Sequence, residues 1–495
     1  MKKIVIIGIL LLMGCSIVQA QILTLTNAIK IAQENSLDAQ IARFSFMSKY
    51  WQYRSFQAQL KPSVNLGGTL GSYNHSLSQI PDPETGLVNY IGSTTLTNDL
   101  TLSLDQKIVA TGGTISLRSS LERQDQFKNK FNNLTNTVSI FKAQPFHITY
   151  SQDLRAFNSL KWEKKTAPME YQVAERTYIS ALQDVTITVT SLFFNVLSAQ
   201  SNYKQSLATV EDRERLYEMA KTRLELTTTT KSDVLQLELS LLNARMSVKN
   251  NKIALDDAMY DLFSYLRVSD YADAELIPPY SVPDLLVNAD DVLQKAIKNS
   301  THGLDQQLQL LEAQKILAQA KANKGIQMSL SSTLGFENKG FSVSESYRDL
   351  MDNEIIGLTL SLPIFDWGVS KGKVKMAQAQ LDVVKTQLEQ SHLDFMQNLR
   401  KKVTQFNAQP SQCRDALRAQ EIAVERYEIT RKRYEAGAIS VTELNTAQQE
   451  MESAKAQYIS QLSSFWNDYY TLQKATLYDW QSKSDLTVDF EKIIK

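Results

Sequence analysis

The most informative property of this sequence is what it contains little of. Gly (17) and Pro (10) are scarce for 495 residues, which favours long uninterrupted helices over a loop-rich sandwich. Lys plus Arg equals Asp plus Glu, at 53 each, so the chain lacks the basic excess of a nucleic-acid surface. Apolar residues make up 43%, which excludes wholesale disorder. The composition therefore predicts a folded, helix-rich protein with no nucleic-acid partner.

Residues that ligate metals or act as nucleophiles are also rare. The four histidines are scattered, and the chain contains neither an HExxH motif nor a Cys-x-x-Cys pair. Of the two cysteines, only Cys413 lies beyond the N-terminal leader, so no intrachain disulfide is expected there. Gly67-Gly68 and Gly112-Gly113 lack the Lys-Ser/Thr of a phosphate-binding loop. We therefore expect no enzyme activity, no metal site and no cofactor.

Long apolar runs are missing except near the N-terminus. There, Lys2 and Lys3 precede an apolar stretch at 4–13 that is too short to span a bilayer, which is typical of a secretory signal. Cleavage after Ala20 is favoured; the alternative is a lipobox ending at Cys15, which would leave Cys15 lipidated, but Met is a poor residue for that motif. No later run of eighteen apolar residues occurs, so no transmembrane helix is expected.

The chain matches itself at two constant offsets in residue number. Identical residues recur between segments 32–71 and 296–335 at an offset of 264, and between segments 149–260 and 359–470 at an offset of 210. Identities that keep one register over tens of positions indicate an internal repeat. The two offsets differ by 54, which is the length by which the first half exceeds the second, and this insert lies within 71–146.

Short alternating segments precede long helical ones in each half. Residues 356–362 alternate apolar and small polar side chains with the period of a strand, and 146–151 do the same. Strands are also predicted at 64–70 and 328–334, each after an amphipathic helix. Each half is thus predicted as a helix, two strands and two very long helices.

The long helical segments repeat apolar residues at steps of three and four. The pattern runs from Leu182 to Tyr203, breaks at 226–230 and resumes at Val234, and a similar pattern runs from Leu444 to Phe465. A sustained 3.5-residue period is a coiled-coil seam. A helix over 162–224 would be ~95 Å long, far beyond ordinary globular helices.

The insert contains two further alternating runs, LTLSLD (100–105) and TISLRSSL (114–121), joined through a glycine turn at 109–113. The polar connections at 74–97 and 122–145 are expected to be long loops on the opposite side. Whether the insert adds strands to a barrel stays open at this stage.

Strands of about nine residues are long enough to cross an outer membrane when tilted. Unpaired strand edges are not tolerated in lipid, and four or six strands are too few to enclose a channel, so the barrel must be shared between chains. Trp162 and Trp367, near strand ends, are expected in an interfacial aromatic belt. The strand-to-helix junctions then join a membrane pore to a hollow helical cylinder.

Four segments carry a specific resemblance. IGLTLSLPIFDWG (356–368) and RYEAGAISVTEL (433–444) resemble a barrel strand and a periplasmic hairpin of the TolC-type outer-membrane efflux family. RLELTTTTKSDV (223–234) and LFFNVLSAQ (192–200) resemble the first-repeat counterparts. With the duplication, the resemblance covers nearly the whole mature chain.

The resemblance implies a mixed α+β membrane protein: a homotrimer whose β-barrel in outer-membrane lipid continues into a coiled-coil α-helical barrel in the periplasm. It also implies the exit duct of a tripartite efflux or type I secretion system, with a periplasmic adaptor and an inner-membrane pump as partners. The expected boundaries are a signal at 1–20, repeat 1 at 21–277, a linker at 278–288, repeat 2 at 289–480 and a tail at 481–495.

The resemblance also implies adaptor-docking tips between the long helices. Gly437 fits a tight helix–helix turn, because a left-handed residue is easiest without a Cβ. The first repeat has Thr227 where the family has glycine, which suggests a looser tip. The docking residues are Arg433, Glu435, Ala436, Gly437, Ala438, Arg223, Thr227 and Thr228.

A periplasmic gate follows from the same resemblance. Glu443 would face the tunnel axis, so a trimer would present a ring of three carboxylates that attracts cations. The alternative is that Glu443 is a solvated helix-start acid favoured by the helix dipole. Tyr434 matches a family gate tyrosine and is expected to hydrogen-bond to Asp233 or Ser232 and hold the tip shut.

Two positions depart from the family's gate. Thr446 replaces a second ring carboxylate, and Ile439 replaces a gate arginine, so cation block should be weaker and one salt-bridge lock is missing. A different class of function also stays open, a trimeric coiled-coil surface scaffold or adhesin without transport. That alternative explains export and heptads but not a duplicated strand–helix unit with equivalent tips.

Overall fold

The computed structural model describes residues 22–81, 88–128, 136–226, 229–269, 274–279 and 282–494. The signal region, Cys15 and the turn residues Thr227 and Thr228 lie outside the described residues. The chain forms two compact units, and each draws on both sequence halves. Unit 1 comprises residues up to Met47, Glu175–Gly303 and His392–Lys495; unit 2 comprises Ser48–Ala174 and Leu304–Ser391.

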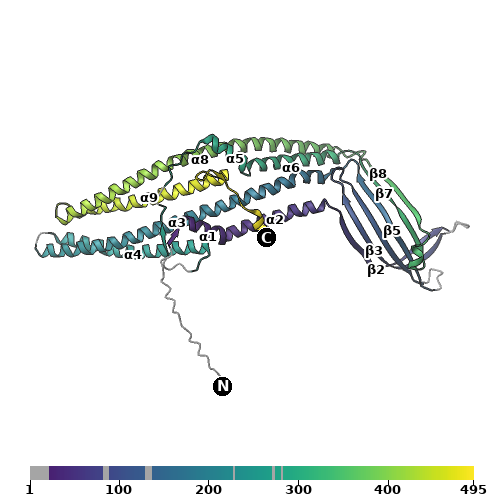
Figure 1. Ribbon diagram of the computed structural model, residues 1–495, viewed down its shortest axis with the longest axis horizontal. Helices are drawn as coiled ribbons and strands as arrows, with labels where there is room; N and C mark the ends of the chain where they lie inside the picture. Colours follow the sequence, from purple (N-terminus) through teal and green to yellow (C-terminus); the bar gives the residue numbers. More distant parts are fainter. Residues whose placement is uncertain are drawn as a thin grey trace, which may run out of the picture. The chain divides into compact units, whose positions relative to one another are not determined.

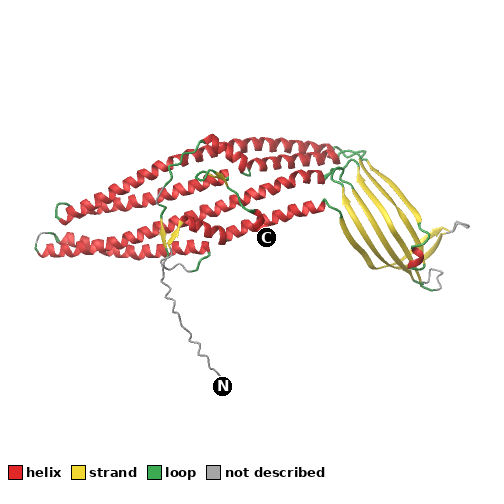
Figure 2. Ribbon diagram, in the orientation of Figure 1, coloured by secondary structure: helices red, strands yellow, loops and turns green. Residues whose placement is uncertain are grey.

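Unit 2 contains a six-stranded antiparallel sheet in the order β2-β3-β4-β5-β7-β8 (Figures 1 and 2). The strands are β2 (Ser63–Pro81), β3 (Val88–Lys107), β4 (Thr114–Gln126), β5 (Val138–Asp153), β7 (Gln327–Gly340) and β8 (Met351–Ser361). The insert supplies β3 and β4, which are hydrogen-bonded to β2 on one side and β5 on the other. The question left open by the sequence is thereby answered: the insert adds two strands to the sheet.

The strands are longer than the alternating runs predicted. Much of 74–97 and 122–145 was expected to be loop, yet β2 and β3 run to Pro81 and from Val88, and β4 and β5 run to Gln126 and from Val138. At 74–77 and 122–126, where the side chains are described, polar residues lie on both faces, so these extensions lack an apolar alternation. Backbone ladder hydrogen bonds form whatever the side chain, which is why periodicity missed them.

The sheet has one apolar and one polar face. Directly paired residues on neighbouring strands point to the same face of the sheet. The apolar face runs across all six strands through the pairs Leu66↔Leu102, Leu104↔Leu117, Leu117↔Ile148, Ile148↔Leu334 and Leu330↔Leu358. The other face carries pairs such as Thr149↔Thr333 and Ser103↔Arg118. The predicted period-2 strands are confirmed, with their apolar residues on a single face.

Helices in unit 2 pack against one another beside the sheet connections. This unit holds parts of α2 (Leu37–Gln59), α3 (Ser159–Glu225), α6 (His302–Asn323) and α8 (Val369–Glu435), while α7 (Val343–Ser346) lies between β7 and β8. Tyr53 of α2 stacks on Tyr171 of α3 with ring centroids 5.0 Å apart. Ala313 and Leu317 of α6 pack with Ala377 and Leu381 of α8.

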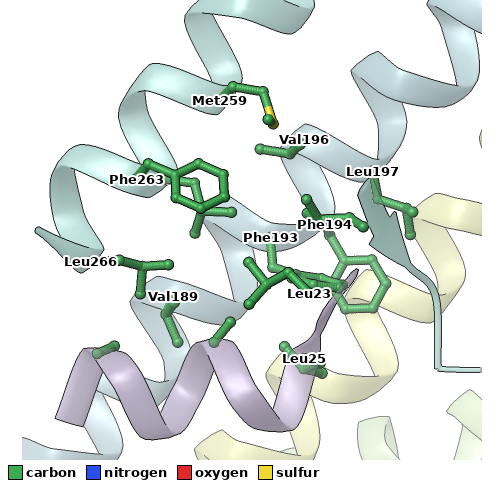
Figure 3. Close-up of a cluster of buried hydrophobic side chains, with 14 of the residues drawn as sticks. Leu23, Leu25, Val189, Phe193, Phe194, Val196, Leu197, Met259, Phe263 and Leu266 are labelled. Carbon is green, nitrogen blue, oxygen red and sulfur yellow. The ribbon is translucent and has the colours of Figure 1, made fainter. Parts of the chain in front are cut away.

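Unit 1 is a bundle of helical hairpins. Its elements include α1 (Leu25–Asn35), α4 (Lys231–Leu266), α5 (Ala289–Asn299), α9 (Val441–Thr476) and α10 (Phe490–Ile494), with the rest of α3 and α8. Strand β1 (Ile22–Thr24) pairs in parallel with β6 (Glu275–Ile277). Phe193 and Phe194 of α3 lie in a core formed with Leu23, Leu25, Met259 and Phe263 (Figure 3).

The helices of the two halves match in length. Helices α3 and α8 each have 67 residues, α4 and α9 each have 36, and α1 and α5 each have 11. The predicted long helix is confirmed at Ser159–Glu225, and the predicted break lies between Glu225 and Lys231. The single first helix predicted in each half is wrong, because extended residues Ser36 and Ser300 divide it from the helix that follows.

Among the described residues, one helix is long and apolar enough to cross a membrane, whereas the sequence predicted none beyond the signal. This helix is α3, whose most apolar 18-residue window is 44% buried inside the protein. Its residues Val185, Val189, Phe193 and Phe194 are core residues. A single such helix is weak evidence for a span, because a helix that packs on several faces is apolar for that reason alone.

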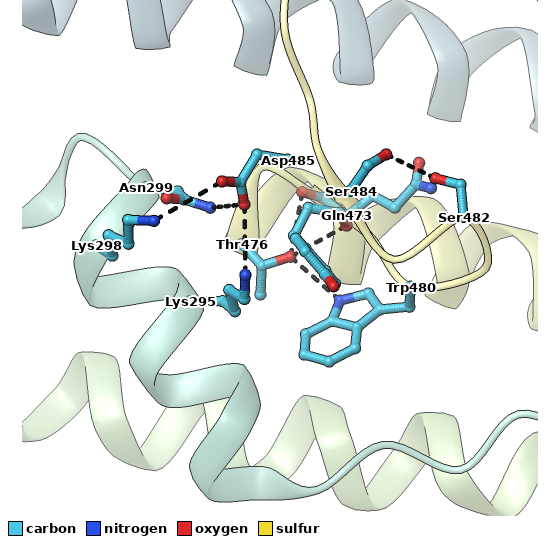
Figure 4. Close-up of polar contacts among 10 residues, drawn as sticks. Lys295, Lys298, Asn299, Gln473, Thr476, Trp480, Ser482, Ser484 and Asp485 are labelled. Atoms are coloured by element: carbon cyan, nitrogen blue, oxygen red, sulfur yellow. Dashed lines mark hydrogen bonds and ion pairs between the residues drawn. The ribbon is translucent and has the colours of Figure 1, made fainter.

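The C-terminal segment folds back onto unit 1. Strands β9 (Tyr478–Asp479) and β10 (Ser484–Asp485) form a short hairpin, and Asp485 accepts a 2.8 Å hydrogen bond from Asn299 and pairs with Lys295 and Lys298 of α5 (Figure 4). Phe490 of α10 packs on Phe46, with ring centroids 4.9 Å apart.

Candidate functional site

The turn between α8 and α9 is a Schellman motif. Helix α8 ends at Glu435, and Gly437 has φ +75°, the left-handed conformation that favours glycine. The Gly437 N–H donates to the Tyr434 carbonyl at 2.9 Å, and the Ala438 N–H donates to the Arg433 carbonyl at 2.9 Å. The tight turn expected from Gly437 is therefore present.

On the α4 side of the turn between α3 and α4, the described residues form a helix cap. Thr230 caps α4: its Oγ1 accepts from the Asp233 N–H at 3.2 Å, and the Asp233 carboxylate accepts from the Thr230 N–H at 3.2 Å. Thr229 also donates to this carboxylate, at 3.1 Å. Hydrogen bonds from the Thr230 side chain and backbone hold the pKa of Asp233 below its usual range.

Polar contacts join the two tips. Arg223 of α3 donates to the Glu435 carbonyl at 2.7 Å, at the C-terminal end of α8, where a cation is favoured by the helix dipole. Arg215 of α3 bridges the Glu435 and Asp212 carboxylates, at 3.0 Å each. Arg223 was predicted to lie at the tip, whereas Arg215 and Asp212 were missed, because a charged run such as 211–215 on a helix usually indicates only a solvated face.

An apolar cluster lies under the tips. Leu216 and Ala220 of α3 and Leu237 of α4 pack with Tyr434 of α8 and Leu444 of α9. Tyr434 is 7% exposed, and burial raises the pKa of its hydroxyl. The two helical hairpins are therefore held together by a shared core as well as by the arginine contacts.

Deeper along the hairpins, a buried polar network connects α3 to α9. Arg213, 5% exposed, donates to Gln448, and Gln448 donates to Thr209 at 3.0 Å and to Glu452 at 2.9 Å. Burial lowers the pKa of Arg213. Nearby, burial and the Asp212 carboxylate raise the pKa of Tyr427, whose hydroxyl donates to Asp212 at 2.8 Å.

Among the described residues, no hydrogen bond or ion pair joins the residues expected to form the gate. Glu443 and Ser232 are exposed, Asp233 is half-buried and Tyr434 is buried. Among the described residues, no hydrogen bond joins Tyr434 to Asp233 or Ser232, so the expected lock is not formed inside one copy. Thr229 and Thr230 donate to Oδ2 of Asp233, while the Tyr434 ring is packed in the apolar cluster.

The remaining tip residues are accessible. Arg433, Ala436, Gly437 and Ala438 are exposed and Glu435 is half-buried. Thr446 is exposed and donates to the Thr442 carbonyl at 3.0 Å, and Ile439 packs at the edge of the apolar cluster. No group of three or more His, Cys, Asp or Glu side chains suited to a metal ion occurs among the described residues.

Comparison with known proteins identifies the fold. The chain is similar to the CmeC outer membrane channel of Campylobacter jejuni, with a TM-score of 0.65, 16% identity and coverage of 95% of this chain and 88% of that one. It is also similar to VceC of Vibrio cholerae, with a TM-score of 0.62, 13% identity and 91% and 95% coverage. The open MtrE outer membrane channel of Neisseria gonorrhoeae gives a TM-score of 0.58, 15% identity and 91% and 88% coverage.

At these identities the solved structures establish the fold alone. No curated protein is similar enough in sequence to match. The model of the outer membrane efflux protein family matches residues 28–266 and 328–476, which is well over half of the chain. This family consists of transport channels rather than enzymes. The chain therefore belongs to the outer membrane efflux protein family, whose members are TolC-type outer-membrane channels.

Proposed function

We propose that this protein is the outer-membrane exit duct of a tripartite efflux or type I secretion system. In this proposal it works as a homotrimer, conducting substrates passively from an inner-membrane pump and a periplasmic adaptor to the exterior. The observation that carries the proposal is the covalent continuity of a two-faced strand with a very long helix. Strand β5 leads into the 67-residue α3, and β8 leads into the 67-residue α8.

The apolar face of the sheet supports a membrane location for the strands. Leu66, Leu102, Ile148 and Leu358 on this face are between 39% and 68% exposed in the isolated chain. An exposed apolar surface of this extent is unfavourable in water and favourable against lipid. At the β8–α8 junction Trp367 is 88% exposed beside Phe365, which suits a ring at the headgroup level.

An unpaired coiled-coil seam on α4 supports the homotrimer. Six large apolar residues recur along α4 at steps of four, three or seven, and each is more than half exposed: Leu235, Leu239, Leu242, Met246, Ile253 and Tyr260. Such a 3.5-residue seam is buried only by a neighbouring helix. In the homotrimer, helices of adjacent copies would cover it and close a helical cylinder.

The matched element lengths support an internal duplication. The first residues of α8 and α9 have numbers higher by 210 than those of α3 and α4, and the first residues of α5 and β7 have numbers higher by 264 than those of α1 and β2. These are the same two offsets at which the sequence matches itself. The helical barrel of a trimer would then have six equivalent hairpins, two from each copy.

The exposed tips suit the docking of an adaptor. Arg433, Ala436, Gly437 and Ala438 project from a turn that is held rigid by the Schellman bonds and by Arg223. A rigid, small-residue turn offers its backbone to a partner with little loss of conformational entropy on binding. The three Glu443 side chains of a trimer would form a cation-attracting ring near the same entrance.

Two measurements test this proposal. Light scattering in mild detergent is expected to give a trimer, because an isolated copy exposes both the sheet face and the α4 seam; a monodisperse monomer would contradict it. Reconstitution in planar bilayers is expected to give ion conduction. A trimer that inserts and never conducts would instead favour the surface scaffold or adhesin.

A further inference from the structure

The two outer strands of the sheet each have a free edge. Within the described chain, β2 pairs only with β3 and β8 pairs only with β7. On the apolar face, Leu66 of β2 is 68% exposed and Leu358 of β8 is 59%, against 50% for Leu102 and 46% for Leu334 on inner strands. A free backbone edge in lipid leaves N–H and C=O groups unsatisfied, so both edges require a partner strand.

A second copy of this chain fits both edges. All neighbouring strands are antiparallel, so β8, the sixth strand, runs opposite to β2. Placing β8 of one copy beside β2 of the next therefore continues an antiparallel ladder without a parallel junction. Such head-to-tail contacts generate a ring where the rotation between copies closes, as it does in the proposed trimer.

The register of that junction is available from the chain itself. Strands β5 and β7 join the first half of the sheet to the second, and they pair as Thr149↔Thr333 and Ile148↔Leu334. Adding 210 to a residue number in β5 gives the equivalent position in β8, and subtracting 264 from a residue number in β7 gives the equivalent position in β2. The pairing of β5 with β7 therefore predicts that Thr359 of one copy lies opposite Thr69 of the next, and Leu358 opposite Leu70.

The mapped register agrees with the faces of the sheet. Thr149 Oγ1 lies 3.4 Å from Thr333 Oγ1 on the polar face, and Thr359 and Thr69 belong to the same face in their own strands, since Thr359 pairs with Ser329 and Thr69 with Asp99. Leu358 and Leu70 belong to the apolar face. A one-residue slip would set an apolar residue against a polar one along the whole junction.

We infer that β8 of each copy pairs with β2 of the next copy in this register, and that the β3–β4 hairpin is part of the wall. Three copies of six strands then close a barrel of eighteen strands. This inference rests on the trimer of the proposed function. Without the hairpin each copy would supply four strands, so the hairpin widens the barrel by about half, because diameter grows roughly linearly with strand number.

The register is tested by a disulfide between copies. With Cys413 replaced by Ala, the pair Thr69→Cys and Thr359→Cys is expected to yield covalent trimers on oxidation. The matched control is Thr69→Cys with Ser361→Cys, two residues out of register on the same face, for which at least tenfold less cross-linking is expected. Equal or stronger cross-linking of the control overturns the register.

The width is tested by dipolar spectroscopy on a spin label at Ser331→Cys, a position on the polar face. The comparison variant replaces residues 74–137 with a copy of 338–347, the equivalent connection of the second half. In this variant, β2 is connected to β5 by the same short segment that connects β7 to β8, and the whole insert is absent.

Label-to-label distances in the hairpin-less trimer are expected to fall to about two-thirds of those in the full-length trimer. Unchanged distances overturn the eighteen-strand barrel while leaving the proposed function intact. A full-length protein that is monomeric contradicts the proposed function itself. If the hairpin-less variant does not fold, the disulfide pair still decides the junction.

Discussion

The two hairpin tips are built on helices of equal length, yet their described residues are held by different hydrogen bonds. The α8–α9 turn depends on the backbone of Gly437, in a left-handed conformation with both Schellman bonds made. At the other tip, the start of α4 is held by side chains, since Thr230 and Asp233 form a capping box there. The α8–α9 turn is thus held by backbone geometry, whereas the start of α4 is held by titratable and replaceable groups.

The largest effect is expected for Gly437→Val. A Cβ at this position would meet only Arg223 Nη2, at 4.0 Å, so the cost is conformational rather than a clash. A β-branched residue at positive φ is strained by roughly 1–2 kcal/mol or more, which should distort the turn. We expect adaptor-dependent efflux to fall at least tenfold, with the trimer and membrane insertion intact. Gly437→Asn, which tolerates this conformation, is the control; normal efflux in Gly437→Val would contradict a docking role.

The second largest effect concerns Glu443 and Asp233, which occupy equivalent positions in the two repeats. If Glu443 forms a ring, Glu443→Gln should reduce cation selectivity and trivalent-cation block in single-channel recordings, because three converging carboxylates are removed. Asp233→Asn is the matched variant and should change selectivity less, since that carboxylate is engaged by Thr229 and Thr230. Unchanged selectivity in Glu443→Gln would leave Glu443 as a helix-start acid.

A smaller effect is expected where the tips are joined. Arg223→Ala removes the donor to the Glu435 carbonyl and should destabilise the second tip by about 1 kcal/mol. Hydrogen exchange of amides 436–440 is expected to accelerate about fivefold. Arg433→Ala is the control, because Arg433 is an exposed arginine at the equivalent place in the second half. Equal effects of the two variants would show that Arg223 does not hold the tips together.

Effects of equal or smaller size concern the two caps. Thr230→Ala should destabilise the start of α4 by about 1 kcal/mol, and Ser440→Ala should cost α9 less, since Thr230 both accepts from the Asp233 N–H and donates to its carboxylate. Hydrogen exchange of the first turn of each helix measures both changes.

The direction of the Asp233 pKa shift determines how the stability of the cap at the start of α4 depends on pH. The pKa of Asp233 is lowered in the folded state, so its stabilisation is present above the unfolded value of about 4 and is lost as the pH falls through the folded pKa. In Asp233→Asn the protection of amides 231–236 should no longer change over that acidic range. The same loss in both proteins would contradict this assignment.

The sequence by itself determined the elements whose signal is local and repeated. Alternation over 356–362 and the 3.5-residue period of the long helices are consequences of which side chains face apolar surroundings, so they predicted β8, α3 and α9 correctly. The self-match at two offsets located the insert, and Gly437 indicated its own turn, because one residue type dominates left-handed positions.

Only the tertiary structure decided the rest. That the insert supplies strands of the sheet depended on backbone pairing of β3 and β4 with their neighbours, and their polar extensions have no apolar period to detect. That Tyr434 is a core residue rather than the partner of Asp233 depended on the distance between side chains on different helices. Sequence periodicity reports the face on which a residue lies, but hydrogen bonds depend on which faces meet, and that is decided by how segments far apart in the chain pack together.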